Sequence, residues 1–122
     1  MSIESEFFIV AREPGHVVHD LPTWANSSLG VVGFDSNPDT PVTRQDVPEV
    51  PGAFQLLNVM SDSECDRFVE ISEALGYNSD APVSLPRSVR HNNSFTWVVD
   101  ESIDQTIWGR CHHLCEASSF DG

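Results

Sequence analysis

The sequence MSDSECDRFVEISEALGY (residues 60–77) carries the signals of one complete amphipathic helix. Ser61 is placed to cap the start of this helix, and Glu64 can reach back to Ser61, which is the capping-box pattern. Gly76 follows the last apolar residue and suits the conformation that ends a helix. We therefore predict a helix from Ser61 to Leu75.

One side of this predicted helix is apolar. Helical spacing places four apolar residues on that side: Cys65, Phe68, Val69 and Leu75. The charged residues fall mostly on the other sides: Asp66, Arg67, Glu70 and Glu73. We expect the apolar side to be buried against another apolar part of the protein.

The composition limits the classes of function. The chain has 122 residues, enough for one domain, and 39% of them are hydrophobic, as in globular proteins. The net charge of −13 repels nucleic acids and anionic membranes, so the sequence predicts neither as a partner. Two interpretations of this charge stay open: a solvated acidic surface, or a surface that binds a cationic partner.

The first residues and the cysteines bear on the location of the protein. The sequence MSIESEFFIVAREPG (residues 1–15) has acids where a secretory signal has positive charge. No apolar run approaches the length of a membrane helix. We therefore expect a cytoplasmic protein in which Cys65, Cys111 and Cys115 are reduced thiols.

The segments on either side of the first helix predict an α+β fold. Residues 50–59 are expected to form a strand after a Pro-Gly turn, 78–87 a loop, and 88–99 a bent strand or a strand pair. A second helix is expected from about Ser102, with a capping box to Gln105. Its apolar stripe comprises four residues: Ile103, Ile107, Cys111 and Leu114.

Residues 1–49 differ in character from the rest of the chain. EFFIVA (residues 6–11) is expected to be a short strand, and Pro14–Glu49 an extended arm with many turns. Four apolar residues indicate that this arm packs against a folded part of the protein: Trp24, Val31, Val32 and Phe34. We predict an arm of residues 1–49 and an α+β domain of residues 50–122. The domain's sheet edges and helix stripes would need further chain to cover them.

Three segments carry a resemblance to a known family by their order. They are PGAFQLLNVMSDSECDRFVEISEALGY (residues 51–77), VSLPRSVRHNNSFTWVVDE (residues 83–101) and IWGR (residues 107–110). In this order they resemble the N-terminal half of iron(II)- and 2-oxoglutarate-dependent oxygenases, and the prolyl 4-hydroxylase-like branch in particular. The resemblance covers residues 50–116, and residues 1–49 match nothing in the family.

This resemblance implies a fold and an activity. The chain would supply the supporting helices and first strands of a double-stranded β-helix, or jelly roll, that is incomplete in these residues. The helix from Ser61 to Leu75 would be a buttress on its major sheet. The complete dioxygenase would hydroxylate an unactivated C–H bond of a small-molecule or peptide substrate. Its cofactors would be iron(II) and 2-oxoglutarate, with ascorbate as a reductant.

The iron ligands of that family have no match in this sequence. In the family, two histidines and one carboxylate hold the iron, and two of these come from a His-x-Asp or His-x-Glu pair on one strand. None of the five histidines is followed two residues later by Asp or Glu: His16, His19, His91, His112 and His113. We therefore expect the ligands to lie beyond Gly122, and this fragment alone to be inactive and without cofactors.

Two local clusters are candidates for a separate metal site. HVVHD (residues 16–20) brings two histidines and an acid together, or it is an arm with incidental histidines. CHHLCE (residues 111–116) places Cys111 and Cys115 one helical turn apart, which suits zinc or a redox pair. The alternative for both cysteines is packing in the core, where small thiols are common.

RSVRHNN (residues 87–93) is the predicted substrate-binding segment, because in the resembling family this region borders the active-site mouth. Arg90 could bind a carboxylate, and Asn92 and Asn93 could hydrogen-bond a polar substrate. The alternative is that Arg90 pairs with an acid and the asparagines form a turn. The three tryptophans are expected in the core rather than as ligand platforms: Trp24, Trp97 and Trp108.

A second class of function stays open beside the oxygenase. The chain would then be a small acidic interaction module without catalysis, and an unpaired sheet edge would bind its partner.

Overall fold

The described part of the protein is a mixed α+β structure with two α-helices and two small sheets. The computed structural model describes residues 6–15, 17, 20–36, 40–80, 88–89 and 92–115. The elements follow in this order: β1 (Phe7–Glu13), β2 (Leu21–Asn26), β3 (Thr43–Asp46), β4 (Phe54–Leu57), α1 (Asp62–Leu75), β5 (Trp97–Val98), α2 (Glu101–Cys111) and the 3-10 turn η2 (His112–Leu114). The predicted α+β class is confirmed. None of the helices in this described part is long and apolar enough to cross a membrane.

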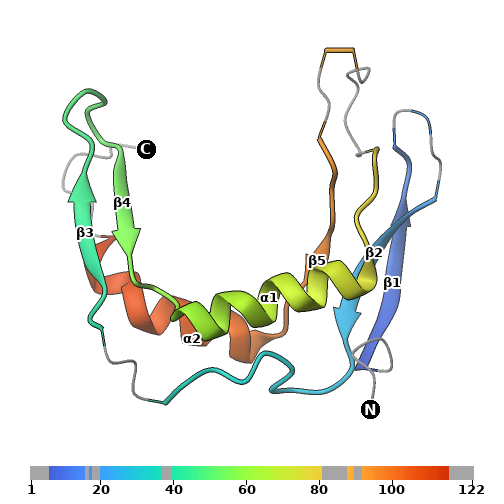
Figure 1. Cartoon of the computed structure of the whole chain (residues 1–122), viewed down its shortest axis with the longest axis horizontal. Helices are drawn as coiled ribbons and strands as arrows, with labels where there is room; N and C mark the ends of the chain where they lie inside the picture. Colours follow the sequence, from blue (N-terminus) through green and yellow to red (C-terminus); the bar gives the residue numbers. More distant parts are fainter. Residues whose placement is uncertain are drawn as a thin grey trace.

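The two sheets lie at opposite ends of the pair of helices (Figure 1). One sheet has the order β1-β2-β5, in which β1 and β2 are antiparallel and β2 and β5 are parallel. The other is the antiparallel hairpin of β3 and β4. Neither sheet closes on itself in the described part of the chain, so both keep open edges.

The segment predicted to be an extended arm contains two strands that the sequence analysis missed. These are β2, which pairs with both β1 and β5, and β3, which pairs with β4. β2 is hard to predict because it contains Pro22, and proline cannot donate a hydrogen bond to a neighbouring strand. β3 is hard to predict because many turn residues surround it. The predicted strands at residues 6–11 and 50–59 are present as β1 and β4.

The start of α1 is capped as the sequence predicts. The Ser61 hydroxyl accepts a hydrogen bond from the Glu64 backbone N–H at 3.2 Å. The Glu64 carboxylate accepts one from the Ser61 N–H at 2.8 Å, which completes the capping box. Gly76 ends the helix with a φ of 93°, where glycine carries no steric penalty.

The start of α2 differs from the prediction by one residue and by its cap. Asp100, not Ser102, is the N-cap, and its carboxylate accepts a hydrogen bond from the Ile103 N–H at 3.1 Å. The predicted partner Gln105 instead donates to the Glu101 carboxylate. Aspartate is among the best N-cap residues, which is why it takes this position from the serine two residues later.

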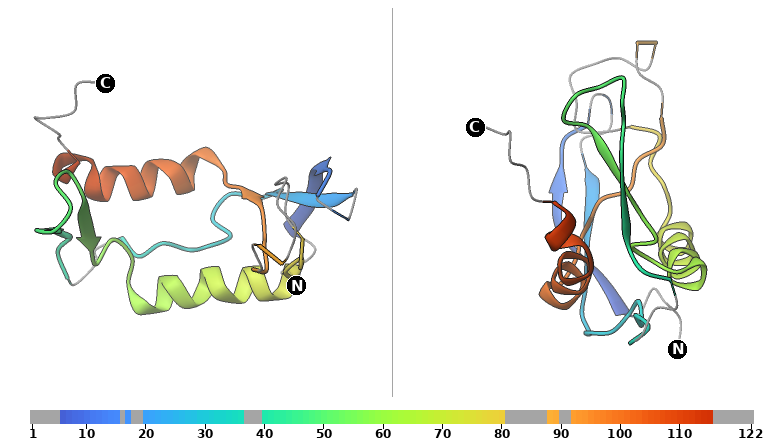
Figure 2. Two further views of the ribbon diagram at one scale, coloured as in Figure 1. Left: turned by 90° about the horizontal axis from the view of Figure 1, so that it is seen from above. Right: turned by 90° about the vertical axis from the view of Figure 1, so that its left-hand side faces the viewer.

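The core lies where the chain between the sheets passes along both helices. Four residues are buried together there: Phe7, Val32, Ile71 and Ile103. Seen from above in Figure 2, the segment after β2 runs along the gap between α1 and α2, and Figure 1 shows that it lies below both helices. It therefore packs against both helices from one side. The packing predicted for Trp24, Val31, Val32 and Phe34 is confirmed, because all four belong to this core or pack against it.

The buried side of α1 is only partly the predicted one. Ile71 and Glu64 are buried on it, with Phe68 and Leu75 partly buried beside them. Cys65 and Val69, both predicted to be buried, are exposed. The helix is rotated relative to the prediction because the Glu64 carboxylate, and not the Cys65 thiol, points inward. In α2 the predicted stripe holds, since Ile103 and Cys111 are buried and Ile107 packs on the core.

Aromatic side chains join the first sheet to α1. Trp97 contacts Phe7 edge-on with ring centroids 5.4 Å apart, and it contacts Phe68 at 5.6 Å. Phe68 in turn contacts Phe34 at 6.0 Å. The core role predicted for Trp24 and Trp97 is confirmed, whereas that for Trp108 is wrong, because 57% of this residue is exposed.

Phe68 should therefore be the residue of α1 whose truncation weakens this aromatic chain. We expect Phe68→Ala to lower the free energy of unfolding by about 3 kcal/mol, the low end of the range for phenylalanine, because the ring is only partly buried. The exposed Glu70 is the control, and Glu70→Ala should change stability by less than about 0.5 kcal/mol. Urea denaturation measures both. Equal effects of the two changes would contradict this packing.

Candidate functional site

The structure describes only some of the predicted substrate-binding residues. Arg90 lies outside the described residues, as do His16, His19 and His91. Asn92 and Asn93 are described, and both are exposed. The residue that follows them, Ser94, forms two backbone hydrogen bonds with Asn78, with N–O distances of 2.7 and 2.6 Å. The two asparagines are therefore held beside a fixed bridge.

A small polar hollow lies next to that bridge. Its lining comes from β1, β2 and the two bridged segments: Glu13, Leu21, Pro22, Thr23, Asn78, Asp80, Ser94 and Thr96. Its free volume of about 10 Å³ suits one water molecule. Asp80 is 7% exposed and accepts a hydrogen bond from the Val17 N–H at 2.7 Å. This hollow is too small for an organic substrate.

Gly15 permits the close packing beside Asp80. A β-carbon at this position would lie 2.6 Å from an Asp80 carboxylate oxygen and 2.7 Å from a Leu21 methyl. Both distances are far below van der Waals contact, so a side chain here would displace the carboxylate or the leucine.

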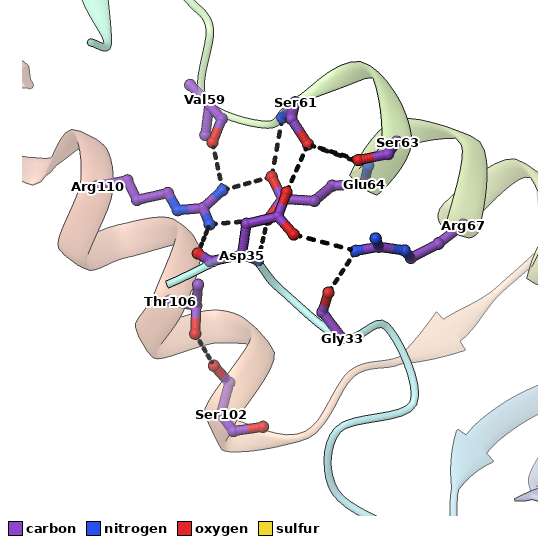
Figure 3. Close-up of polar contacts among 10 residues, drawn as sticks. All are labelled: Gly33, Asp35, Val59, Ser61, Ser63, Glu64, Arg67, Ser102, Thr106 and Arg110. Atoms are coloured by element: carbon purple, nitrogen blue, oxygen red, sulfur yellow. Dashed lines mark hydrogen bonds and ion pairs between the residues drawn. The ribbon is translucent and has the colours of Figure 1, made fainter. Parts of the chain in front are cut away.

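The most strongly built polar cluster of the described chain centres on Glu64 and Arg110 (Figure 3). Each carboxylate oxygen of Glu64 accepts a hydrogen bond from one terminal nitrogen of Arg110, both at 2.8 Å. The Glu64 side chain is completely buried and that of Arg110 is 12% exposed. This bidentate geometry is the strongest hydrogen-bonded arrangement of an arginine and a carboxylate.

Both oxygens of Glu64 and both terminal nitrogens of Arg110 make further hydrogen bonds. Glu64 accepts from the backbone N–H groups of Ser61 and Asp35, at 2.8 and 2.7 Å. Arg110 donates to the backbone carbonyls of Val59 and Asp35, at 2.9 and 3.0 Å. Its guanidinium also lies over the Phe34 ring, 5.1 Å from the centroid. The pair therefore joins α1, α2 and the segment that packs against both.

Arg67 fixes the same segment from its exposed side. Its guanidinium donates to the Gly33 carbonyl and lies 3.8 Å from an Asp35 carboxylate oxygen. Asp35 also accepts a hydrogen bond from the Ser61 hydroxyl at 3.1 Å. Both charged side chains of this second pair are about 40% exposed, at 38% and 43%, so water screens it strongly.

The pair determines the ionisation of Glu64. Hydrogen bonding from Arg110 lowers the pKa of Glu64 from 4.5 to about 2, assisted by the two backbone N–H groups and opposed by burial. Since the folded state holds the carboxylate ionised, its stabilisation is fully present above pH 4.5. It is lost as the pH falls from 4.5 to about 2.

A second polar network joins the first sheet to α2. The Asn26 side-chain amide donates to the Asp100 carboxylate at 2.5 Å, and its carbonyl accepts from the Trp97 indole N–H at 3.2 Å. Burial raises the pKa of Asp100, but the hydrogen bonds from Ser102, Asn26 and the Ile103 backbone outweigh it and lower the pKa overall. Asp100 thus caps α2 as a carboxylate.

The cysteine and histidine cluster at the end of α2 does not converge on one point. The Cys111 thiol donates to the Ile107 carbonyl at 3.2 Å, and the Cys115 thiol to the Cys111 carbonyl at 3.4 Å. His112 and His113 are exposed, and the His112 ring lies against Trp108. Within the described residues, no three His, Cys, Asp or Glu side chains are grouped to hold a metal ion.

The residues that the structure describes do not form an iron(II) facial triad. The sequence has no His-x-Asp or His-x-Glu pair. The buried carboxylates that the structure describes are already engaged by an arginine or by backbone N–H groups. No reaction step is therefore assigned to side chains of this chain.

Comparison with known proteins leaves the family open. No protein-family model, no curated protein and no solved structure matches this chain.

The pair of Glu64 and Arg110 was not predicted from the sequence, although a signal was present. Glu64 occupies the same helical face as Phe68, Ile71 and Leu75, at spacings of four, seven and eleven residues. A glutamate on an apolar face must be paired when it is buried. Arg110 falls beside the predicted stripe of the second helix and is the matching cation.

Removing one partner of this pair should be far more damaging than removing both. We expect Arg110→Met to lower the free energy of unfolding by about 3–5 kcal/mol, because it leaves Glu64 buried as an uncompensated charge. Combining it with Glu64→Leu should recover much of that loss. Urea denaturation of the two single variants and the double variant measures the coupling.

Arg67→Met is the matched control for this prediction, since it removes an arginine from the exposed pair with Asp35. It should change stability by at most about 1 kcal/mol. Equal losses for Arg110→Met and Arg67→Met, or strictly additive effects of Glu64→Leu and Arg110→Met, would show that the buried pair does not hold the helices together.

Proposed function

We propose that this chain is the N-terminal, non-catalytic part of an iron(II)- and 2-oxoglutarate-dependent dioxygenase of the prolyl 4-hydroxylase-like type, with a cytoplasmic setting. Its two helices and open sheets would support a double-stranded β-helix formed with further chain. The whole enzyme would hydroxylate an unactivated C–H bond of a small-molecule or peptide substrate. Iron(II), 2-oxoglutarate and ascorbate would be bound or used outside the residues of this chain.

The observation that supports this proposal most directly is the way two of the resembling segments are joined. Glu64 belongs to the segment SDSEC that opens the first helix, and Arg110 to IWGR of the second. These two residues form the buried, doubly hydrogen-bonded ion pair. The two helices that carry the resemblance are therefore fixed to each other. Helices that support a catalytic sheet would need to be fixed in this way.

The order of the elements also agrees with the proposal. A strand, β4, leads directly into α1, and a short strand, β5, leads directly into α2. The open edges of both sheets in the described chain offer positions for further strands. In this arrangement Arg90, Asn92 and Asn93 would contact the substrate of the whole enzyme, and the exposure of the two asparagines leaves them available.

A non-catalytic interaction module is the alternative function, and one observation favours it. Along β1, Phe8, Ile9 and Val10 are 47%, 37% and 51% exposed. β1 is also the outer strand of its sheet, so it has a free edge in the described chain. Exposed apolar edge strands commonly pair with another chain. The module would then bind a partner protein through β1 and have no enzymatic role.

Iron binding and succinate release separate these two functions. We expect the 122-residue chain to release no succinate from 2-oxoglutarate in the presence of iron(II), because it lacks the ligands. A longer protein translated from the same gene past the codon for Gly122 should contain a His-x-Asp or His-x-Glu pair. That protein should bind iron(II) and release succinate. The control replaces the histidine of that pair with alanine.

Two results would contradict the oxygenase. One is a stop codon directly after Gly122, and the other is a longer protein that has the histidine and carboxylate ligands but releases no succinate. Succinate release by the 122-residue chain itself would instead contradict the proposal that this chain is the non-catalytic part of the enzyme.

A further inference from the structure

Two cysteines lie one turn apart where the second helix changes its geometry. Cys111 is the last residue of α2 and is 6% exposed, whereas Cys115 follows η2 and is half-buried. The backbone leaves α-helical geometry at Cys111, where φ is −127° and ψ is −10°, and continues as the 3-10 turn. The two thiols are thus separated by a single turn whose geometry is already irregular.

The two sulfur atoms are neighbours on the same side of this turn. Each thiol donates to the carbonyl four residues earlier, Cys111 to Ile107 and Cys115 to Cys111. Burial raises the pKa of Cys111, and the adjacent Cys115 thiol raises it further. Cys65, the third cysteine, is exposed on α1. A raised pKa leaves less of the reactive thiolate at Cys111, so the half-buried Cys115 is the thiol of the pair that meets an oxidant first. Cys111 is then the thiol that reacts with the oxidised Cys115.

The turn between the two cysteines is attached to the hairpin of β3 and β4. Arg44, in β3, donates to the Leu114 carbonyl at 2.8 Å. The same guanidinium lies 3.9 Å from the centroid of the Phe54 ring in β4 and pairs with Asp46 at 2.9 Å. Arg44 therefore connects the two strands of the hairpin with the turn that contains the cysteines.

Closing a bond between the two sulfurs would have to change this turn. Disulfides need α-carbons about 4.4–6.8 Å apart, and residues four apart are about 6 Å apart in an α-helix but further apart in a 3-10 turn. The turn His112–Leu114 must therefore tighten when the bond forms. Tightening moves the Leu114 carbonyl, which is the acceptor of the Arg44 hydrogen bond.

We propose that Cys111 and Cys115 are a redox pair that controls how the hairpin of β3 and β4 is held. A peroxide oxidises the Cys115 thiol to a sulfenic acid and leaves as water, or as the alcohol of an organic peroxide. The Cys111 sulfur then attacks the Cys115 sulfur, an S–S bond forms, and the sulfenic oxygen leaves as a second water. In sum, two thiols lose two protons and two electrons to one peroxide. The Arg44 contact with Leu114 is lost in the oxidised form.

Trypsin allows a direct test with hydrogen peroxide as the probe. Cleavage after Arg110 gives the peptide Cys111–Gly122, which contains both cysteines of the pair and not Cys65. The Cys65→Ser variant serves as the starting protein, so that no disulfide between chains can form through that exposed thiol. After peroxide and then alkylation, the peptide should lack alkyl groups and should have lost two hydrogen atoms. In Cys65→Ser with Cys115→Ser, Cys111 should instead be alkylated.

Hydrogen exchange of the intact Cys65→Ser protein tests the connection to the hairpin. Oxidation should increase amide exchange in residues 43–57 severalfold and leave that of α1 unchanged. Arg44→Met should give at least this increase without peroxide, since it removes the contact with Leu114 together with those to Asp46 and Phe54. A peptide that gains oxygen atoms or alkyl groups after peroxide would overturn the redox pair. Unchanged exchange in the hairpin of the oxidised protein would overturn its control by the pair.

Discussion

The ion pair between Glu64 and Arg110 is the constraint on which the arrangement of the helices depends. A buried carboxylate without a cation would be strongly destabilising, so the inward position of Glu64 in α1 requires Arg110 in α2. Glu64 also accepts a hydrogen bond from the Asp35 N–H, and Arg110 donates one to the Asp35 carbonyl. One interaction therefore sets the rotation of α1, the position of the C-terminal turn of α2, and the path of the segment that packs against both.

This arrangement differs from an ordinary helical pair, in which apolar side chains of two helices meet directly. Here the segment with Val32 and Phe34 packs against both helices from one side, and the ion pair joins the two helices directly (Figures 2 and 3). The N-terminal strands complete the same core through Phe7 and Trp97. The two helices are thus a fixed platform with a sheet at each end, and the open edges of those sheets are where a larger fold or a partner would join.

The sequence predicts the local features of this structure well and the distant ones poorly. The capping box of Ser61 and Glu64 was predictable because both residues lie within one turn. The burial of Glu64 was not predicted, because its partner Arg110 is 46 residues away. β2 was missed because Pro22 lies within it, and because its pairing with β1 and with the distant β5 is what makes it a strand. Of the predicted substrate-binding residues, the structure describes only the exposed Asn92 and Asn93.

The ionisation of Glu64 in the folded protein is the most direct test of this central role. Carbon-13 NMR of the side-chain carboxyl carbon, followed from pH 7 downward, reports the charge of this one residue. The account predicts that Glu64 stays ionised at pH 4.5 and titrates with a pKa of about 2. A carboxyl group that is half protonated at pH 4.5 while the protein is folded would show that Arg110 does not hold it, and would contradict the account.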